Sequence, residues 1–231
     1  MAIRKNDAFN KIEVEFEKMS NILLEQLDTI EQILTAKELV VSDNILQKIT
    51  VNEKLIDEME VRISDMIVNT IVLQQPMASE LRAIIACYRN LINMERIGDL
   101  VVNIISFIKK IKTPELYNHF NEIFSSMSIL CSKMVRHAIL SYIQKDKELA
   151  IWTIKTDDIL DEVNRKLMKK LLNKADSEEK NKDLLKSMIM IKEMMSNIER
   201  IADYATNIAE ASVYVIEGKD IRHKKPEETE N

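Results

Sequence analysis

The sequence predicts an all-α protein built from two tandem, pseudo-symmetric three-helix bundles. Turn-forming residues are scarce, because the 231 residues include only 2 glycines and 3 prolines, against roughly 16 and 12 expected from average usage. Leu, Ile, Met, Glu and Lys, which favour helices, are abundant. Few turn residues and many helix formers together indicate a handful of long helices. An internal repeat, described below, divides these helices into two sets of three.

The first three helices are predicted from apolar residues at helical spacing and from the breaks between them. The first spans about Asn6 to Leu34, and Thr35 and Ser42 are candidate caps before the second. Pro76 marks the break before the third helix. That third helix carries a stripe of apolar residues that two acids continue: Leu81, Ile85, Tyr88, Ile92, Glu95 and Asp99.

The last three helices are predicted from capping signals. Thr113 suits the N-cap of the fourth helix, with Pro114 as its first residue. Asp176 or Ser177 is predicted to cap the sixth helix, which Gly218 would end. The expected spans are about 114–143, 146–172 and 177–218. Long helices joined by short loops pack as antiparallel neighbours, so we expect helix bundles.

The two halves of the chain repeat with a fixed offset. Residues 95–104 read ERIGDLVVNI and residues 199–208 read ERIADYATNI, so that six of ten positions are identical. The same offset of 104 positions places Glu53 on Asp157 and Asp57 on Asp161 without a gap. We therefore expect one bundle at residues 5–110 and a second at 111–218, followed by a charged, frayed tail at 219–231.

Each half carries two pairs of acids spaced four residues apart, so both carboxylates of a pair lie on one face of a helix. The pairs are Glu53/Asp57 and Glu95/Asp99 in the first half, and Asp157/Asp161 and Glu199/Asp203 in the second. Asn103 and Asn207 extend two of these faces by one turn. Four carboxylates at one seam repel each other unless a cation neutralises them. Hard oxygen ligands suit Mg²⁺, Ca²⁺, Mn²⁺ or iron, with zinc as a further candidate, so the pattern predicts metal sites.

Two other interpretations of these acids stay open. They could form ordinary solvated faces, paired in part with Arg96 and Arg200. They could also belong to a carboxylate-bridged metal enzyme or a metal store. A di-iron site of that kind uses Glu-x-x-His on facing helices, and the three histidines, His119, His137 and His223, lack this spacing. The sequence contains no glycine-rich phosphate loop, recognisable catalytic triad or Cys/His zinc cluster, so it does not indicate an enzyme.

Charge and composition bear on other classes of function. A net charge of −5 and few aromatic residues give no reason to expect nucleic acid as a partner. The apolar runs all fall short of the ~20 residues of a membrane span, so any membrane association is expected to come through partners. Cys87 and Cys131 lie far apart and no signal peptide is recognised. We therefore expect two reduced core thiols in a cytoplasmic protein.

Two copies of E-R-I-x-D-x-x-x-N-I, each preceded by a helix with an E/D-x-x-x-D pair, resemble the PhoU family of phosphate-signalling regulators. The resemblance covers about residues 5–218, including the approach to the first motif at Leu81 and Arg82. One departure is Leu100, where members of the family often carry histidine.

The resemblance implies a homodimer of chains with two three-helix bundles, multinuclear iron or zinc clusters, and no organic cofactor. It assigns the metal ligands to Glu53, Asp57, Glu95, Asp99, Asp157, Asp161, Glu199 and Asp203, with Asn103 and Asn207 as weaker candidates.

The function that the resemblance implies is not enzymatic. Members of the family act as negative regulators of phosphate uptake and of the phosphate-starvation response, through contact with the ATPase of a phosphate ABC transporter and with a sensor histidine kinase. Related helical proteins accompany low-affinity phosphate permeases, and this alternative stays open.

Overall fold

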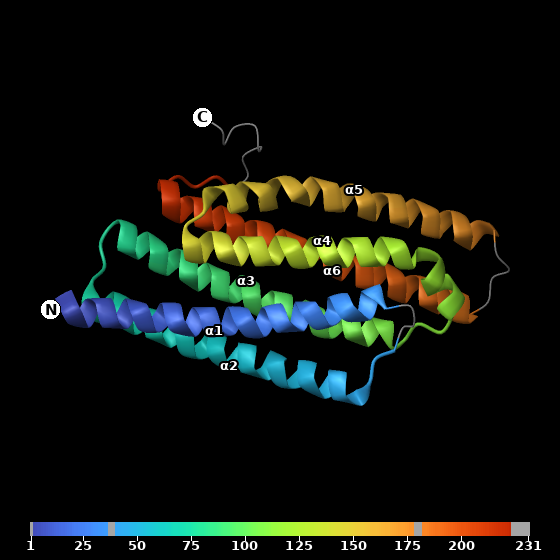
Figure 1. The fold of residues 1–231 in the computed structure, drawn as a ribbon, viewed down its shortest axis with the longest axis horizontal. Coiled ribbons are helices and arrows are strands. Elements are labelled where there is room, and N and C mark those ends of the chain that lie inside the picture. Colours follow the sequence, from blue (N-terminus) through green and yellow to red (C-terminus); the bar gives the residue numbers. More distant parts are fainter. Residues whose placement is uncertain (1, 37–39, 178–181, 223–231) are drawn as a thin grey trace.

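A computed structural model describes residues 2–36, 40–177 and 182–222, and it confirms the predicted all-α fold class. The described residues form six helices and no strand. The helices are α1 (Ala2–Thr35), α2 (Asp43–Gln74), α3 (Ser79–Ile108), α4 (Pro114–Gln144), α5 (Lys147–Ser177) and α6 (Lys182–Glu217) (Figure 1). None of these helices is long and apolar enough to cross a membrane.

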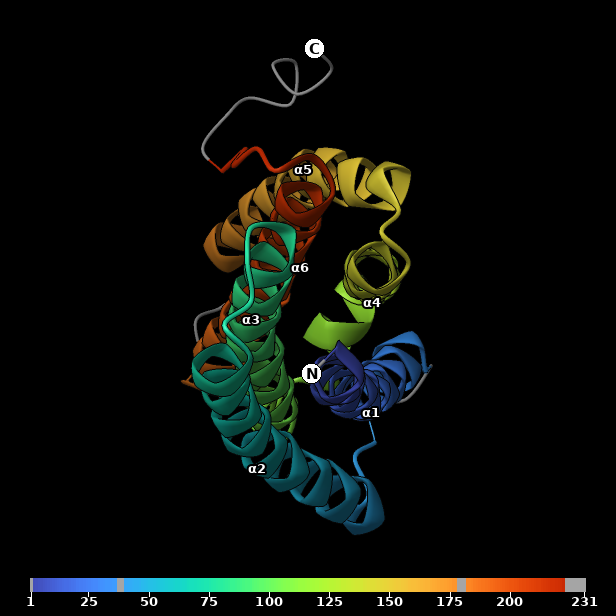
Figure 2. The same cartoon turned by 90° about the vertical axis from the view of Figure 1, so that its left-hand side faces the viewer.

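The six helices form two layers. Helices α2, α3, α6 and α5 lie side by side in that order as a curved layer, and α1 and α4 pack together on one side of it (Figure 2). The three contacts among α1, α2 and α3 recur among α4, α5 and α6, as two copies of one three-helix bundle require. The most extensive contact of all joins α3 to α6. These two helices therefore hold the bundles together.

One apolar core runs through both bundles. Its cluster of buried residues includes Phe16 on α1, Ile56 on α2, Met94 on α3, Phe120 on α4 and Ile201 on α6. Complete burial of a side chain of this size contributes about 1.5–3 kcal/mol, so this continuous cluster is the main source of stability. The two cysteines confirm the prediction of core thiols, since both are buried and free.

Several helix ends follow the predicted capping chemistry. The Ser42 hydroxyl accepts a hydrogen bond from the backbone N–H of Ile45 at 3.3 Å, at the start of α2. Before α5, a carboxylate oxygen of Asp146 accepts from the N–H groups of Glu148 and Leu149 at 2.9 and 3.2 Å. Gly218 follows α6 with φ of 73°, a conformation that glycine adopts without strain.

Of two further predicted caps, one is confirmed in position and one is wrong. Thr113 is the N-cap residue of α4 and Pro114 is its first residue, as predicted, although the Thr113 side chain makes no capping hydrogen bond. The hydroxyl of Ser187 on α6 accepts from the N–H groups of Lys112 and Thr113, at 2.9 and 3.0 Å, so a tertiary contact fixes the segment that leads into α4. The predicted cap of α6 at Asp176 or Ser177 is wrong, because both residues lie within α5. Residues 178–181 lie outside the described part of the chain.

The apolar stripe predicted on α3 lies on its less buried side, with Ile85 and Ile92 only half-buried. Leu81 and Tyr88 are 38% and 39% exposed, whereas Ile84 and Leu91 are buried. Because α3 packs against α1, α2 and α6, it is apolar around much of its circumference, and periodicity alone could not decide which apolar side faces the core.

The predicted tail is only partly described. Residues 219–222 follow α6, and Ile221 among them is buried, whereas residues 223–231 lie outside the described residues. The boundaries of the two bundles at 5–110 and 111–218 stay a prediction, to be checked by superposing the two segments.

The two glycines provide a paired test of this fold. A Cβ at Gly98, within α3, would meet Ile56 at 3.4 Å and Gln26 at 3.6 Å, which are ordinary contacts, and the residue 104 positions later is the buried Ala202. Gly98→Ala is expected to raise the free energy of unfolding by about 0.5–1 kcal/mol, because alanine loses less backbone entropy in a helix.

Gly218→Ala serves as the opposite case, because φ of 73° is strained for any residue with a Cβ. It is expected to lower the free energy of unfolding by about 1–2 kcal/mol. Urea unfolding of the two variants measures both changes, and a destabilised Gly98→Ala variant would contradict the packing described around α3.

Candidate metal centres

The first acidic site forms where α2 packs against α3. Glu53 and Asp57 lie one turn apart on α2, and Glu95 and Asp99 lie one turn apart on α3. Glu53 and Glu95 are half-buried, while Asp57 and Asp99 are exposed. The structure thus brings all four predicted residues to the solvent edge of one helix contact.

Like-charge repulsion across this contact shows that the four carboxylates are close neighbours. Burial, followed by the charges of Asp57 and Asp99, raises the pKa of Glu53. Burial, followed by Asp99 and Asp57, also raises the pKa of Glu95. The pKa of Asp99 is raised by burial and by Asp57. The charge of Asp57 thus raises the pKa of all three other acids.

The second acidic site repeats this arrangement where α5 packs against α6. Burial, followed by the charges of Asp203 and Asp161, raises the pKa of Asp157 to about 7. Burial, followed by Asp161 and Asp203, raises the pKa of Glu199 as well. Burial and Asp161 raise the pKa of Asp203. The four predicted residues of the second half therefore also form one group.

Asn164 belongs to the second site and was missed in the sequence. Its side-chain amide donates a hydrogen bond to a carboxylate oxygen of Glu199 at 2.5 Å, which favours the ionised form of that acid. The signal was present, because Asn164 lies seven residues after Asp157 and therefore on the same helix face. In the first half the equivalent residue is Glu60, which adds to the repulsion at Glu95.

The structure does not support the alternative in which arginines neutralise these acids. Among the described residues, none of the eight carboxylates forms a salt bridge. Arg96 instead donates to the hydroxyl of Tyr204 at 3.5 Å and lies over its ring. Arg96 and Arg200 make only minor contributions to the pKa values of Glu95 and Asp203.

The donor set fits an oxygen-liganded cation in its chemistry but is not closed around one. Oδ1 of Asp157 is buried without a hydrogen-bond partner, and a cation would satisfy it and relieve the repulsion. Within residues 2–36, 40–177 and 182–222, however, no three His, Cys, Asp or Glu side chains converge on one point that could hold a metal ion. Ligation would therefore require rotation of the carboxylates, and metal binding stays a prediction.

The remaining candidate residues lie apart from the acids or in different surroundings. Asn103 and Asn207 are exposed, one turn beyond Asp99 and Asp203. Leu100 is buried in the core, so this position provides no ligand. His119 and His137 lie on α4, where they pack against Phe120 and Trp152, and His223 lies outside the described residues.

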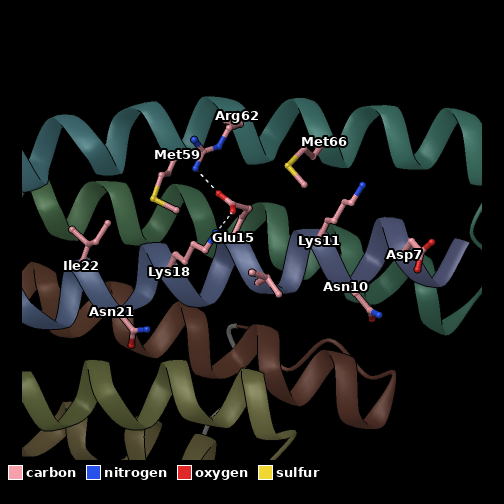
Figure 3. A pocket seen from close by; sticks show the side chains of 11 residues that line it. Asp7, Asn10, Lys11, Glu15, Lys18, Asn21, Ile22, Met59, Arg62 and Met66 are labelled. Carbon is pink, nitrogen blue, oxygen red and sulfur yellow. Dashed lines mark hydrogen bonds and ion pairs between the residues drawn. The ribbon is translucent and has the colours of Figure 1, made fainter. Parts of the chain in front are cut away.

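A wide cleft of about 1010 Å³ between α1 and α2 contains none of the eight acids. Glu15 lies within it and joins Arg62 and Lys18, the latter at 2.7 Å (Figure 3). The hydrogen bond from Lys18 and the charge of Arg62 lower the pKa of Glu15. Since Glu15 is already paired with two basic side chains, the cleft holds no cluster of unpaired carboxylates among the described residues and is not an alternative to the acidic sites.

Both halves of the chain are similar to a known protein family. The family model described as the PhoU domain matches the chain twice, at residues 16–108 and 124–212. The chain is 27% identical over 144 residues to a phosphate-specific transport system accessory protein PhoU homolog of Clostridium acetobutylicum, an alignment covering 62% of this chain and 64% of the relative. It is 28% identical over 162 residues to the homolog of Pseudomonas aeruginosa, covering 67% and 64% of the two chains. These alignments span less than two thirds of either relative.

Solved structures share the fold over almost the whole chain. The crystal structure of PhoU from Pseudomonas aeruginosa matches with a TM-score of 0.81 and 22% identity, covering 93% of this chain and 99% of that one. The phosphate transport system regulatory protein PhoU from Streptococcus pneumoniae matches with a TM-score of 0.81 and 20% identity, covering 94% and 98%. Both likenesses support the arrangement of the six helices.

The raised pKa of Asp157 predicts a distinctive pH dependence of stability. Its folded pKa of about 7 exceeds the ordinary value of 3.8, so between these pH values the folded chain binds more protons than the unfolded chain. The free energy of unfolding of the metal-free protein should therefore fall as the pH rises from about 4 to about 7. With allowance for solvent screening, we expect this group to contribute about 1–2 kcal/mol to the fall.

Asp157→Asn should reduce that fall and make the chain more stable than wild type at pH 8. Urea unfolding of chelator-treated protein between pH 4 and 8 measures both effects. Glu148→Gln is the matched control, because it removes an exposed charge from the same helix that is not among the charges acting on Asp157, so it should change the slope much less. Equal slopes for wild type and Asp157→Asn would show that Asp157 is an ordinary surface acid.

Proposed function

Because the chain belongs to the PhoU family, we propose that it is an accessory regulator of phosphate transport. In this proposal it represses phosphate uptake and the phosphate-starvation response when phosphate is ample, and it acts by contact with other proteins. The names of its relatives, which describe accessory proteins of a phosphate-specific transport system, support the proposal most directly.

The proposed partners are the ATPase of a phosphate ABC transporter and a sensor histidine kinase, contacted by a homodimer of this chain. In this proposal, apolar side chains exposed at equivalent positions of the two halves are the candidate contact residues. Three equivalent pairs are exposed: Leu55/Ile159, Val68/Leu172 and Leu81/Leu185.

We further propose that the two acidic sites bind cations. Glu53, Asp57, Glu95 and Asp99 would hold metal in the first half, and Asp157, Asp161, Glu199 and Asp203 in the second. The resemblance favours iron or zinc, and the all-oxygen donor set also suits Mg²⁺, Mn²⁺ or Ca²⁺. A bound cation would supply positive charge that lets neighbouring carboxylates stay ionised together. The unpartnered Oδ1 of Asp157 is the single observation that favours this most.

Deletion of the gene is the direct test of the regulatory function. Loss of a repressor should leave phosphate-regulated genes expressed in phosphate-rich medium, and this is measured as transcript level with and without phosphate. Wild-type chain supplied from a plasmid should restore repression. An unchanged phosphate response in the deletion strain would contradict the proposal, and oxygen-dependent turnover by the iron-loaded protein would favour a metal enzyme.

Metal content tests the acidic sites one at a time. Elemental analysis of the wild-type chain should find more than one ion per chain. Glu95→Ala combined with Asp99→Ala should remove the metal of the first half only, because the second site uses different helices. Removing all metal should leave the fold largely intact, since the apolar core provides most of the burial.

Asp65→Ala combined with Glu58→Ala is a suitable control, because it removes two exposed acids of α2 that belong to neither site. This control should bind as much metal as wild type. Equal metal content in wild type and in a variant lacking all eight carboxylates would show that the acids are only a solvated face.

A further inference from the structure

A second polar cleft, distinct from the acidic sites, lies over the contact between α3 and α6. Four of its residues lie on one face of α3, at positions i, i+3, i+4 and i+7, and four lie on one face of α6 at the same spacing. The segment after α6 adds Asp220 and Arg222. The cleft has a volume of about 260 Å³, slightly below the range of roughly 300–1,000 Å³ usual for drug-sized ligands. It therefore suits a small ligand.

The lining of this cleft is rich in hydrogen-bond donors. Three guanidinium groups, from Arg89, Arg96 and Arg222, converge from three different segments. The side-chain amides of Asn93 and Asn207 and the hydroxyl of Tyr214 add neutral donors. Glu210 and Asp220 supply the acids of the lining, so the formal charge of the cleft is positive by one unit.

Two of the three arginines, Arg96 and Arg222, are held in place by their surroundings. Arg96 lies 5.8 Å from the centroid of the Tyr204 ring, a contact that orients the guanidinium plane. Ile221 is buried to 6% exposure, and it anchors the segment that carries its neighbours Asp220 and Arg222 at the cleft. Held guanidinium groups lose less entropy when they bind an anion.

Asp220 already behaves as an oxyanion bound to this cleft. Nε of Arg222 donates to Oδ1 and Oδ2 of Asp220 at 2.9 and 3.1 Å, and Nη2 donates to Oδ2 at 2.5 Å. Hydrogen bonding with Arg222, with a smaller contribution from the charge of Arg89, lowers the pKa of Asp220 to about 2. The Asp220 carboxylate thus already binds one of the guanidinium groups that a ligand would bind.

The repeat shows that this set of charges is particular to one end of the α3/α6 contact. At the offset of 104 residues, Arg96 corresponds to Arg200, but Arg89 corresponds to Glu193. A purely structural role for the arginines in holding α3 to α6 would apply equally to both ends. The additional positive charge at one end is instead what an anion site requires.

We propose that this cleft binds a small oxyanion of the phosphate class. A phosphate group offers several oxygens to several guanidinium forks at once and carries the negative charge that the cleft lacks. Arg89 and Arg96 bind the ligand, the two asparagine amides complete its shell, and Asp220 competes with it for Arg222. The cleft contains Arg96 of the first motif and Asn207 of the second, whereas their equivalents Arg200 and Asn103 lie outside it. The site does not depend on the proposed regulatory function.

Calorimetric titration of the metal-free full-length chain tests the site. Orthophosphate in phosphate-free buffer at pH 7.5 and low salt should bind saturably to one site per chain. Arg89→Gln and Arg96→Gln should each weaken binding about tenfold or more, since each removes a charge-assisted contact. Arg200→Gln is the matched control: it removes the same charge from the equivalent position of the second half and should change affinity less than twofold.

Asp220→Asn should bind orthophosphate several-fold more tightly, because the internal competitor is gone.

AMP titrated in parallel distinguishes the source of the phosphate group. Tighter binding of AMP assigns the site to a phosphate ester, and tighter binding of orthophosphate assigns it to the free anion. Absence of saturable binding of both probes at millimolar concentration overturns the proposal, and so does equal affinity of wild type, Arg89→Gln and Arg96→Gln. Circular dichroism confirms that each variant is folded. Because binding is measured without any transcriptional readout, a failure of the anion-site proposal is distinct from a failure of the proposed regulatory function.

Discussion

The packing of α3 against α6 is the contact on which the rest of the structure depends. It is the most extensive helix contact in the protein, and with the contact between α1 and α4 it joins one bundle to the other. The two helices also carry the twin motifs, so the packing fixes where their acids lie. One acidic site forms on the α2 side of α3 and the other on the α5 side of α6, with the arginine-lined cleft over the contact between them. Helices α3 and α6 therefore each contribute to one acidic site, and together they line the cleft between the two sites.

The acidic sites lower the stability of the folded chain, and burial of the apolar core offsets this loss. Burial and mutual repulsion raise the pKa values of at least three carboxylates at each site, which means that keeping them ionised costs free energy in the folded chain. The free energy gained by burying the apolar core, which runs through both bundles, offsets this cost. Unfavourable charge arrangements that persist in a folded protein are typical of binding sites.

The two halves of the chain are more alike in fold than in the polar side chains at their sites. The acids recur in both halves, but Asn164 supports Glu199 where the first half has Glu60. Tyr204, which holds Arg96, corresponds to the buried Leu100. Apolar packing requires only that equivalent positions have similar size and polarity, whereas a ligand responds to individual charges. The two halves can therefore share one architecture and differ in what they bind.

The sequence by itself determined the helical class, the six elements, the repeat and the eight acids that gather in two groups. These features depend on local periodicity, capping and i, i+4 spacing, all of which act within one helix. Only the tertiary structure decided that Leu81 and Tyr88 face outward, that Ser187 binds the backbone just before α4, and that Arg89, Arg96 and Arg222 line one cleft. Each of these results depends on which side of a helix meets a neighbour far away in the sequence. Such pairing is set by the fit of whole apolar surfaces, which no single stretch of sequence contains.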